Sequence, residues 1–139
     1  MKTKIISVLM LVVMGFALLG GCAAPDDGGQ GAPLEDTRWV LQGYGTPGDL
    51  TVPVGDREAF MVFKADGSFT GSTGCNSYFG GYQLDGNQIS VSGPVGQTEM
   101  ACQGVMDQER AYMQLLQAME SYQIDGSQLT LTGADGVLV

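Results

Sequence analysis

The chain has 139 residues, and six Lys and Arg residues stand against fifteen Asp and Glu residues with no His, giving a formal charge of −9. If Lys2 and Lys4 are removed with a leader, four basic residues remain against fifteen acidic ones, a charge of −11. A surface this acidic repels phosphate backbones, which excludes nucleic acid as a partner. The acidity either keeps the protein soluble or attracts a basic partner.

Residues 1–21 are predicted to be a signal peptide. Lys2 and Lys4 precede an apolar run from Ile5 to Leu19, which has the length of a signal-peptide core. A membrane-spanning helix needs roughly 20 apolar residues, and this run is shorter.

The residues Leu19–Cys22 read LGGC and resemble a bacterial lipobox. In that interpretation Cys22 carries lipid on its sulfur and becomes the first residue of a protein anchored to a membrane outside the cytoplasm. The alternative is an ordinary signal peptide that leaves Cys22 as a free thiol. Ala23 follows the cysteine in place of an Asp, which favours the outer membrane, at its periplasmic face, where the organism has one.

Residues 22–33 are predicted to be a flexible tether between the lipid and the folded domain. They consist mainly of Ala, Pro, Gly and Asp and cannot bury enough apolar surface to fold. No second linker follows, so residues 34–139 are expected to form one domain, just large enough for a single core. We expect this domain to be a monomer.

Strand patterns dominate the domain. Arg38–Gln42 and Ala59–Phe63 are short runs rich in aromatic and β-branched residues. Asp-Gly pairs at 66–67, 85–86, 125–126 and 135–136 suit the type I′ turn, which needs positive φ at both central residues. The pattern predicts a meander of antiparallel hairpins.

Two segments forty residues apart are similar to each other. Tyr82–Gly93 reads YQLDGNQISVSG and Tyr122–Gly133 reads YQIDGSQLTLTG. Either one hairpin unit was duplicated, or two independent hairpins use the same turn chemistry.

One helix is expected over Val105–Ser121, a segment without Gly or Pro. Tyr112, Leu115, Leu116 and Met119 have the spacing of one helix face, which is more often a core face than a docking face. Asp107 is the expected N-cap and Glu109 lies in the first turn. Gln114, Gln117 and Glu120 are expected to face water.

Of the three cysteines, one is expected to carry lipid and the other two to form a disulfide with each other. With Cys22 lipidated, Cys75 and Cys102 remain in an oxidising compartment, which predicts a disulfide. A thioredoxin-like site would need a CxxC motif, and a zinc site would need more ligands than two thiols in a chain without His. A cysteine nucleophile would also lack its usual His base.

Four motifs in order resemble the META domain of the heat-shock protein HslJ family. They are DTRWVL at Asp36–Leu41, GCNSYFGGY at Gly74–Tyr82, TEMAC at Thr98–Cys102 and ERAYMQLL at Glu109–Leu116. The residues that carry the resemblance, besides the two cysteines, are Trp39, Gly74, Asn76, Tyr78, Gly80, Tyr82, Thr98, Met100, Ala101, Glu109 and Tyr112.

The resemblance implies a mainly β fold with one helix, that is, a small antiparallel β-barrel-like domain covered by the helix. Members occur in bacterial envelope lipoproteins and are associated with heat stress and novobiocin resistance. The family brings no catalytic residue, cofactor or metal, and we expect none here. This chain departs from the pattern at its end, where GVLV stands in place of a longer last strand.

The motif residues have a structural interpretation of their own. Gly74 and Gly80 allow tight or bulged backbone, and Asn76 can bond local backbone in a turn. The functional alternative is a ligand-binding rim built on Asn76 and Tyr78.

Three functions follow as hypotheses. The leading one is a non-enzymatic envelope lipoprotein with a stress-related role that binds another envelope component. The alternative is a binding module for a small apolar or lipidic ligand in the barrel mouth, which requires a cavity of about 300 Å³ or more. The third is a hydrolase with a carboxylate pair, which requires two buried carboxyl groups facing one cleft.

Overall fold

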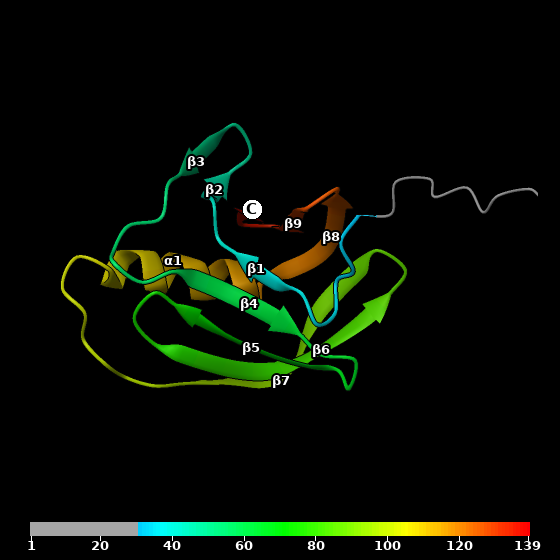
Figure 1. Cartoon of the computed structure of the whole chain (residues 1–139), viewed down its shortest axis with the longest axis horizontal. Coiled ribbons are helices and arrows are strands. Elements are labelled where there is room, and N and C mark those ends of the chain that lie inside the picture. Colours follow the sequence, from blue (N-terminus) through cyan, green and yellow to red (C-terminus); the bar gives the residue numbers. More distant parts are fainter. Residues whose placement is uncertain (1–30) are drawn as a thin grey trace, which may run out of the picture.

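The computed structural model describes residues 31–139, and the predicted signal peptide, Cys22 and most of the tether lie outside them. The domain is mainly β with one helix, which confirms the predicted fold class (Figure 1). Among the residues described, no helix is long and apolar enough to cross a membrane.

Ten strands and one helix make up the fold. They are β1 Arg38–Val40, β2 Tyr44–Thr46, β3 Asp49–Thr51, β4 Ala59–Phe63, β5 Ser68–Thr73, β6 Ser77–Asp85, β7 Gln88–Gln97, α1 Met106–Gln117, β8 Met119–Asp125, β9 Gln128–Gly133 and β10 Gly136–Leu138. The strands form one sheet in the order β1-β4-β5-β6-β7-β8-β9-β10-β2-β3, and all neighbouring strands in it are antiparallel.

The sheet curls into a half-barrel because the segment from Arg38 to Gly43 forms hydrogen bonds with strands on both sides of it, first with β4 and then with the end of β10. The run through β1 pairs first with β4, and its Leu41 N–H still donates to Ala59. The N–H groups of Gln42 and Gly43 then both donate to the carbonyl of Val139, at 2.6 and 3.1 Å. Two consecutive donors on one acceptor form a β-bulge, which bends the strand from one side of the half-barrel to the other.

The type I′ prediction is wrong, and at 85–86 and 125–126 the turn lies one residue later than the Asp-Gly pair. In each of the four pairs the glycine has positive φ and the aspartate does not. Asp85 and Asp125 are the last residues of their strands, and the turns are Gly86-Asn87 and Gly126-Ser127. Glycine at the first central position fits a type II′ turn, because only that position needs positive φ there.

The two similar segments form equivalent hairpins. Tyr82 pairs with Val91 and Tyr122 with Leu131, so each tyrosine lies opposite the same position of its copy. Shared turn chemistry would produce this register as well as duplication would, so both explanations remain.

Helix α1 is shorter than predicted at its C-terminal end. It ends at Gln117, and Met119 already belongs to β8, where it is buried. Asp107 is not the N-cap, because the helix begins after Val105, and no side chain caps it. The predicted apolar face holds for Tyr112 and Leu116, which are buried, and Gln114, Gln117 and Glu120 are exposed.

The core fills the concave side of the sheet, beneath α1. Phe63 lies edge-on to Tyr82, with ring centroids 4.9 Å apart, and 6.3 Å from Phe69. Gly80 is required by this packing, since a Cβ there would lie 2.5 Å from the Phe69 ring. Full burial of each large apolar side chain stabilises the fold by about 1.5–3 kcal/mol.

Candidate functional site

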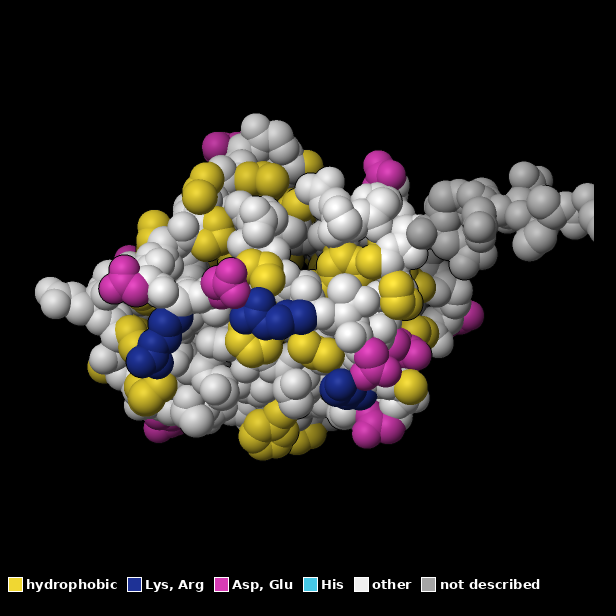
Figure 2. Space-filling view, viewed as in Figure 1, with side chains coloured by type: hydrophobic (Ala, Val, Ile, Leu, Met, Phe, Trp, Pro, Cys, Tyr) yellow, Lys and Arg dark blue, Asp and Glu magenta, His cyan; other side chains and the backbone are white. Residues whose placement is uncertain are grey.

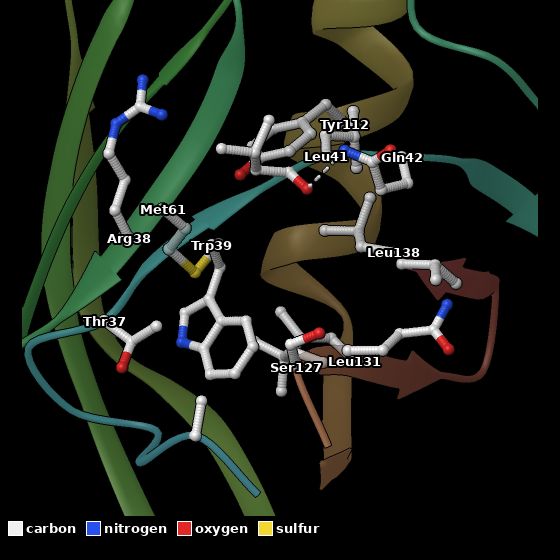
Figure 3. Close-up of a pocket in the computed structure, with 15 residues that line it drawn as sticks. Thr37, Arg38, Trp39, Leu41, Gln42, Met61, Tyr112, Ser127, Leu131 and Leu138 are labelled. Carbon is white, nitrogen blue, oxygen red and sulfur yellow. Dashed lines mark hydrogen bonds between the residues drawn. The ribbon is translucent and has the colours of Figure 1, made fainter. Parts of the chain in front are cut away.

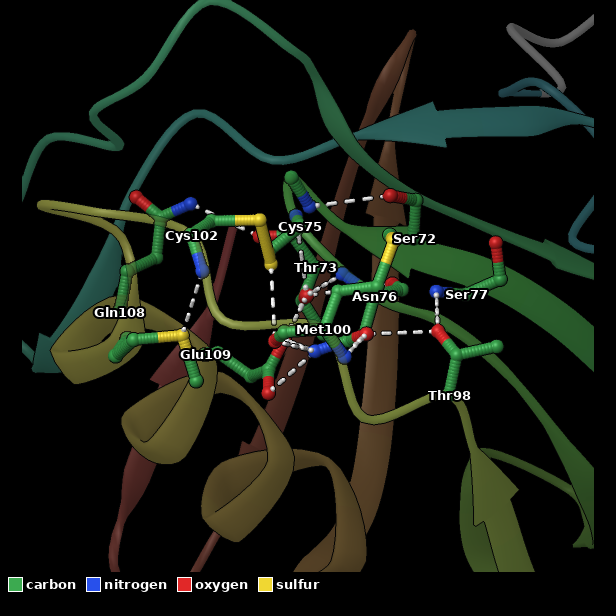
Figure 4. The surroundings of a disulfide bond; sticks show 12 residues. Ser72, Thr73, Cys75, Asn76, Ser77, Thr98, Met100, Cys102, Gln108 and Glu109 are labelled. Carbon is green, nitrogen blue, oxygen red and sulfur yellow. Dashed lines mark hydrogen bonds between the residues drawn. A yellow bond between two sulfur atoms is a disulfide. The ribbon is translucent and has the colours of Figure 1, made fainter.

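Asn76 connects three of the four family motifs (Figure 4). Its side chain is 1% exposed, and its Nδ2 donates to both carboxylate oxygens of Glu109, at 3.0 and 2.8 Å, and to the Met100 carbonyl at 3.0 Å. Its Oδ1 accepts from the Thr98 hydroxyl and from the Met100 N–H, both at 2.7 Å. We call Asn76, Thr98, Met100 and Glu109 the signature node.

Glu109 brings the helix into this node. It lies in the first turn of α1, where the helix dipole favours a negative charge, and it is buried. The Thr73 hydroxyl donates to its second oxygen at 2.6 Å. Because an isolated buried charge is very costly, these donors are what allow the carboxylate to lie inside the protein.

The predicted disulfide lies beside the node. Cys75 and Cys102 are joined, with their Cα atoms 5.8 Å apart. The bond and the node together hold residues 98–102 against the β5–β6 turn. Gly74, which precedes Cys75, has a φ of 92° and provides the tight backbone that its motif predicted.

Asn76 and Tyr78 have structural roles, and the predicted ligand-binding rim is wrong. Asn76 and Tyr78 are both buried, at 1% and 2% exposure, so neither can meet a ligand at the surface. Met100 contributes through its backbone, since its side chain is 49% exposed, and Ala101 is also exposed.

One buried polar residue, Gln108, was not predicted from the sequence. Gln108 donates to the Thr73 carbonyl at 3.0 Å and accepts from the Val54 N–H at 2.7 Å, so it fixes the chain between β3 and β4. Its position one helical turn before Tyr112 places it on the apolar stripe, and that spacing was the available signal.

Three signature tyrosines are held neutral inside the fold. The hydroxyls of Tyr78 and Tyr112 lie 2.6 Å apart, and burial raises the pKa of both well above the usual value. Tyr82 donates to the Lys64 carbonyl at 2.8 Å and to Glu35 at 3.1 Å, and burial together with the Glu35 carboxylate raises its pKa to about 12. These hydroxyls act as hydrogen-bonding groups at neutral pH.

The geometry required for a carboxylate-pair hydrolase is missing from residues 31–139. Glu109 is the one buried acid in this range, and both of its oxygens accept hydrogen bonds from Asn76 or Thr73. A second buried carboxyl group facing it is not found there.

An apolar pocket lies on the other side of the domain, between β1 and the first half of β9. It has a volume of about 510 Å³ and opens to solvent. Trp39 points into it from β1, opposite Leu131 and Leu138 (Figure 3). We call this pocket the slot; its apolar wall consists of Trp39, Leu41, Met61, Leu129, Leu131 and Leu138.

The slot lies beside the end of β10. β10 pairs with β9 only from Gly133 to Leu131, so no described strand covers Leu129 or Gln128. At the other end the Ala32 N–H donates to the Gly126 carbonyl at 2.7 Å, which closes the slot. Space-filling shows the hollow, with hydrophobic side chains around it, on this face (Figure 2).

Trp39 links the family signature to the slot. Its indole N–H donates to the Leu34 carbonyl at 2.9 Å, which fixes the ring, and its face remains part of the slot wall. Among the signature residues, Trp39 and Tyr112 are the ones that line the slot.

Comparison with known proteins agrees with this architecture. The family model of the META domain matches residues 32–139. A solved protein from Burkholderia xenovorans is 27% identical with a TM-score of 0.62, over 76% of this chain and 79% of that one. A second, for which no organism is named, is 21% identical with a TM-score of 0.56, over 73% of this chain and 84% of that one.

None of the curated proteins matches the chain. The family match covers the whole described domain and includes each motif that meets at the signature node. The chain belongs to the META domain family.

Proposed function

We propose that this protein is a non-enzymatic lipoprotein of the bacterial envelope, with a role in envelope stress, whose META domain acts by binding another envelope component in the slot. The slot is the observation that carries the proposal. It offers about 510 Å³ of mainly apolar space, walled by side chains that belong to the hydrophobic core. Binding sites typically have this size and this character.

The location rests on the N-terminal sequence and on the disulfide. The LGGC motif at Leu19–Cys22 supports lipid attachment, and a disulfide supports an oxidising compartment. Residues 22–33 would hold the domain within a few nanometres of the membrane, by the reach of a flexible chain.

Replacing the lipidation site tests this location. In Cys22→Ala, made with an ordinary cleavable signal peptide in place of residues 1–21, we expect the protein to move from the membrane fraction to the soluble envelope fraction, because two or more acyl chains provide stable anchoring and a bare chain provides none. Labelled palmitate should enter the wild-type protein and not the variant, with Cys75→Ala/Cys102→Ala as a control that keeps the label. Equal fractionation of wild type and Cys22→Ala would rule out the lipid anchor.

A small apolar or lipidic ligand is the second candidate, and the same slot favours it. Its volume exceeds the 300 Å³ or so that a ligand site typically needs. Trp39 is the only tryptophan and lies in the slot wall, so its emission reports occupancy. Saturable change of that emission on addition of a long-chain fatty acid is the expected result for this candidate; an unchanged spectrum argues against it.

A further inference from the structure

We infer that the outer face of the two similar hairpins, β6–β7 and β8–β9, binds a neutral glycan, that is, a chain of uncharged sugars rich in hydroxyl groups. This inference goes beyond the proposed function and uses a different surface from the slot. The observations that carry it are the exposed side chains that both hairpins repeat, the polar groove beside them, and the lack of positive charge there.

The two hairpins repeat their exposed residues more closely than their inward ones. The segments correspond at an offset of forty residues, and the inward Ile89 and Val91 have become Leu129 and Leu131 in the second copy. Stability does not require identity at exposed positions, because substitutions there usually have small effects. The exposed pairs that are identical are Gln83 and Gln123, Asp85 and Asp125, and Gln88 and Gln128.

Strand pairing places these side chains on the outer face. Successive residues of a strand alternate between faces, and paired residues share one face. Tyr82 and Leu131 are buried in the core, so their neighbours Gln83 and Thr130 face outward, as does Gln123, the partner of Thr130.

The repeated glutamines do not hold the hairpins together. Elsewhere the exposed Gln114 bonds to Asp135, and Gln42 bonds to the Val40 carbonyl. The four outward glutamines have no hydrogen-bond partner among residues 31–139, and turn chemistry explains the Asp and Gly of each copy but not the Gln. Their amide groups are therefore available to a ligand.

A polar groove of about 690 Å³ lies on the second hairpin, against the β6–β7 turn. We call it the polar groove. Asn87 of that turn lines it together with the outward residues of β8 and β9, and Tyr122 adds part of an aromatic ring. Amides and hydroxyls both donate and accept hydrogen bonds, and carboxylates accept them, which matches the hydroxyl groups of a sugar. The outward residues that line it are Ser121, Gln123, Asp125, Gln128, Thr130 and Thr132.

The repeat favours a polymer over a single sugar. The hairpins are neighbours in the sheet, where Gln88 is the partner of Ser121 (Figure 1). Since neighbouring strands lie about 4.8 Å apart and a strand rises about 3.3 Å per residue, the Asp85–Gln88 pair lies roughly 14 Å from the Asp125–Gln128 pair. A ligand that contacts both pairs must be a chain of several sugars.

Charge and polarity exclude the other polymers. Segments 82–93 and 122–133 contain two Asp and no Lys or Arg, so a phosphate, sulfate or uronate polymer would be repelled without any compensating contact. A protein partner is usually anchored by aromatic, Arg or large apolar side chains, and the outward positions listed above are all small or polar. A neutral glycan requires neither charge nor an apolar anchor.

An amide NMR titration tests the inference on the whole mature chain, as the Cys22→Ala protein purified with its disulfide. The neutral probes are chitotetraose and cellotetraose, and tetragalacturonic acid is the anionic probe of the same length. We expect saturable shifts of the Gln88 and Gln123 signals, side-chain amides included, with a neutral probe and none with the acid. N-acetylglucosamine or glucose should bind at least tenfold more weakly than the matching tetramer, because one sugar reaches one pair only.

Substitutions of exposed glutamines provide the matched comparison. Gln123→Ala should weaken the tetramer about threefold to tenfold, the effect of losing one hydrogen bond. Gln97→Ala removes an exposed glutamine outside the polar groove and should change binding less than about twofold. Gln88→Ala should weaken the tetramer and leave the binding of the single sugar unchanged, since it removes the second contact only. Gln128 is not used, because it lines both the slot and the polar groove.

The outcomes distinguish this inference from the proposed function of the slot. If neither neutral tetramer binds, or if Gln123→Ala binds as tightly as Gln97→Ala, the glycan site is wrong, while Trp39 emission still reports ligands of the slot. Equal binding of the anionic probe would also overturn it. If a sugar shifts the signals of Trp39 and not those of Gln123, it binds in the slot, which contradicts the inference and leaves the proposed function in place.

Discussion

Asn76→Ala is expected to lower the free energy of unfolding by about 3–5 kcal/mol. The substitution removes the amide that donates to both oxygens of Glu109 and leaves a buried carboxylate with the Thr73 hydroxyl as its remaining side-chain donor. Removing one partner of a buried charged group typically lowers the free energy of unfolding by this amount. The Met100 N–H and the Thr98 hydroxyl lose their acceptor at the same time.

Urea unfolding followed by circular dichroism measures this change. Asn87→Ala is the matched control, because Asn87 lies exposed in the β6–β7 turn and should shift the free energy of unfolding by less than about 0.5 kcal/mol. Adding Glu109→Gln to Asn76→Ala should recover part of the loss, because it removes the stranded charge. An Asn76→Ala protein as stable as the control would mean that the signature node does not hold the fold together.

Reducing the Cys75–Cys102 disulfide should lower the free energy of unfolding by about 3–4 kcal/mol. The bond closes a loop with a sequence separation of 27, and the chain-entropy model assigns that loop a stabilisation of this size. For a domain of about 100 residues this corresponds to a fall in Tm of roughly 15 °C or more.

Thermal unfolding with and without reductant measures the fall, and Cys75→Ala/Cys102→Ala provides the control because reductant should not change its Tm. Cys75 is buried, so reduction requires partial opening or denaturant. The loss should not add fully to that of Asn76→Ala, since the two sites share residues 98–102 and neighbouring sites couple. An unchanged Tm after verified reduction would contradict a stabilising bridge.

Sequence patterns of a few residues correctly predicted strand β4 and the buried face of the helix. The run Ala59–Phe63 is strand β4, and the stripe through Tyr112 and Leu116 faces the core. Cysteine arithmetic predicted the disulfide, and four spaced motifs predicted the family. In each case the deciding residues lie within a few positions of each other or have few alternative partners.

The predictions failed where tertiary contacts decide. Met119 continues the apolar stripe of the helix, but pairing with β9 draws it into β8. Short strands β2 and β3 carry no strong sequence pattern and form because β10 and the bulge at Gln42 and Gly43 supply partners. Asn76 has the composition of a turn residue, and only its burial against Glu109 reveals its role.

The slot could not be predicted from spacing at all. It depends on how β1 and β9, about ninety residues apart in sequence, are placed on either side of a short β10. The sequence predicted that a ligand could bind in the mouth of a barrel. It could not predict which residues line the slot, because the order of the strands in the sheet determines them.

Amide hydrogen exchange in native membranes tests most directly whether the protein works through the slot. The lipoprotein would be compared in its own envelope and after purification, with exchange read in segments 38–42 and 127–131 and with segment 59–63 as an internal reference. We expect slower exchange of the amides in segments 38–42 and 127–131 in the envelope, by about tenfold or more, and no change in the reference. Equal exchange of the slot amides in both samples would show that nothing occupies the slot and would contradict the proposed function.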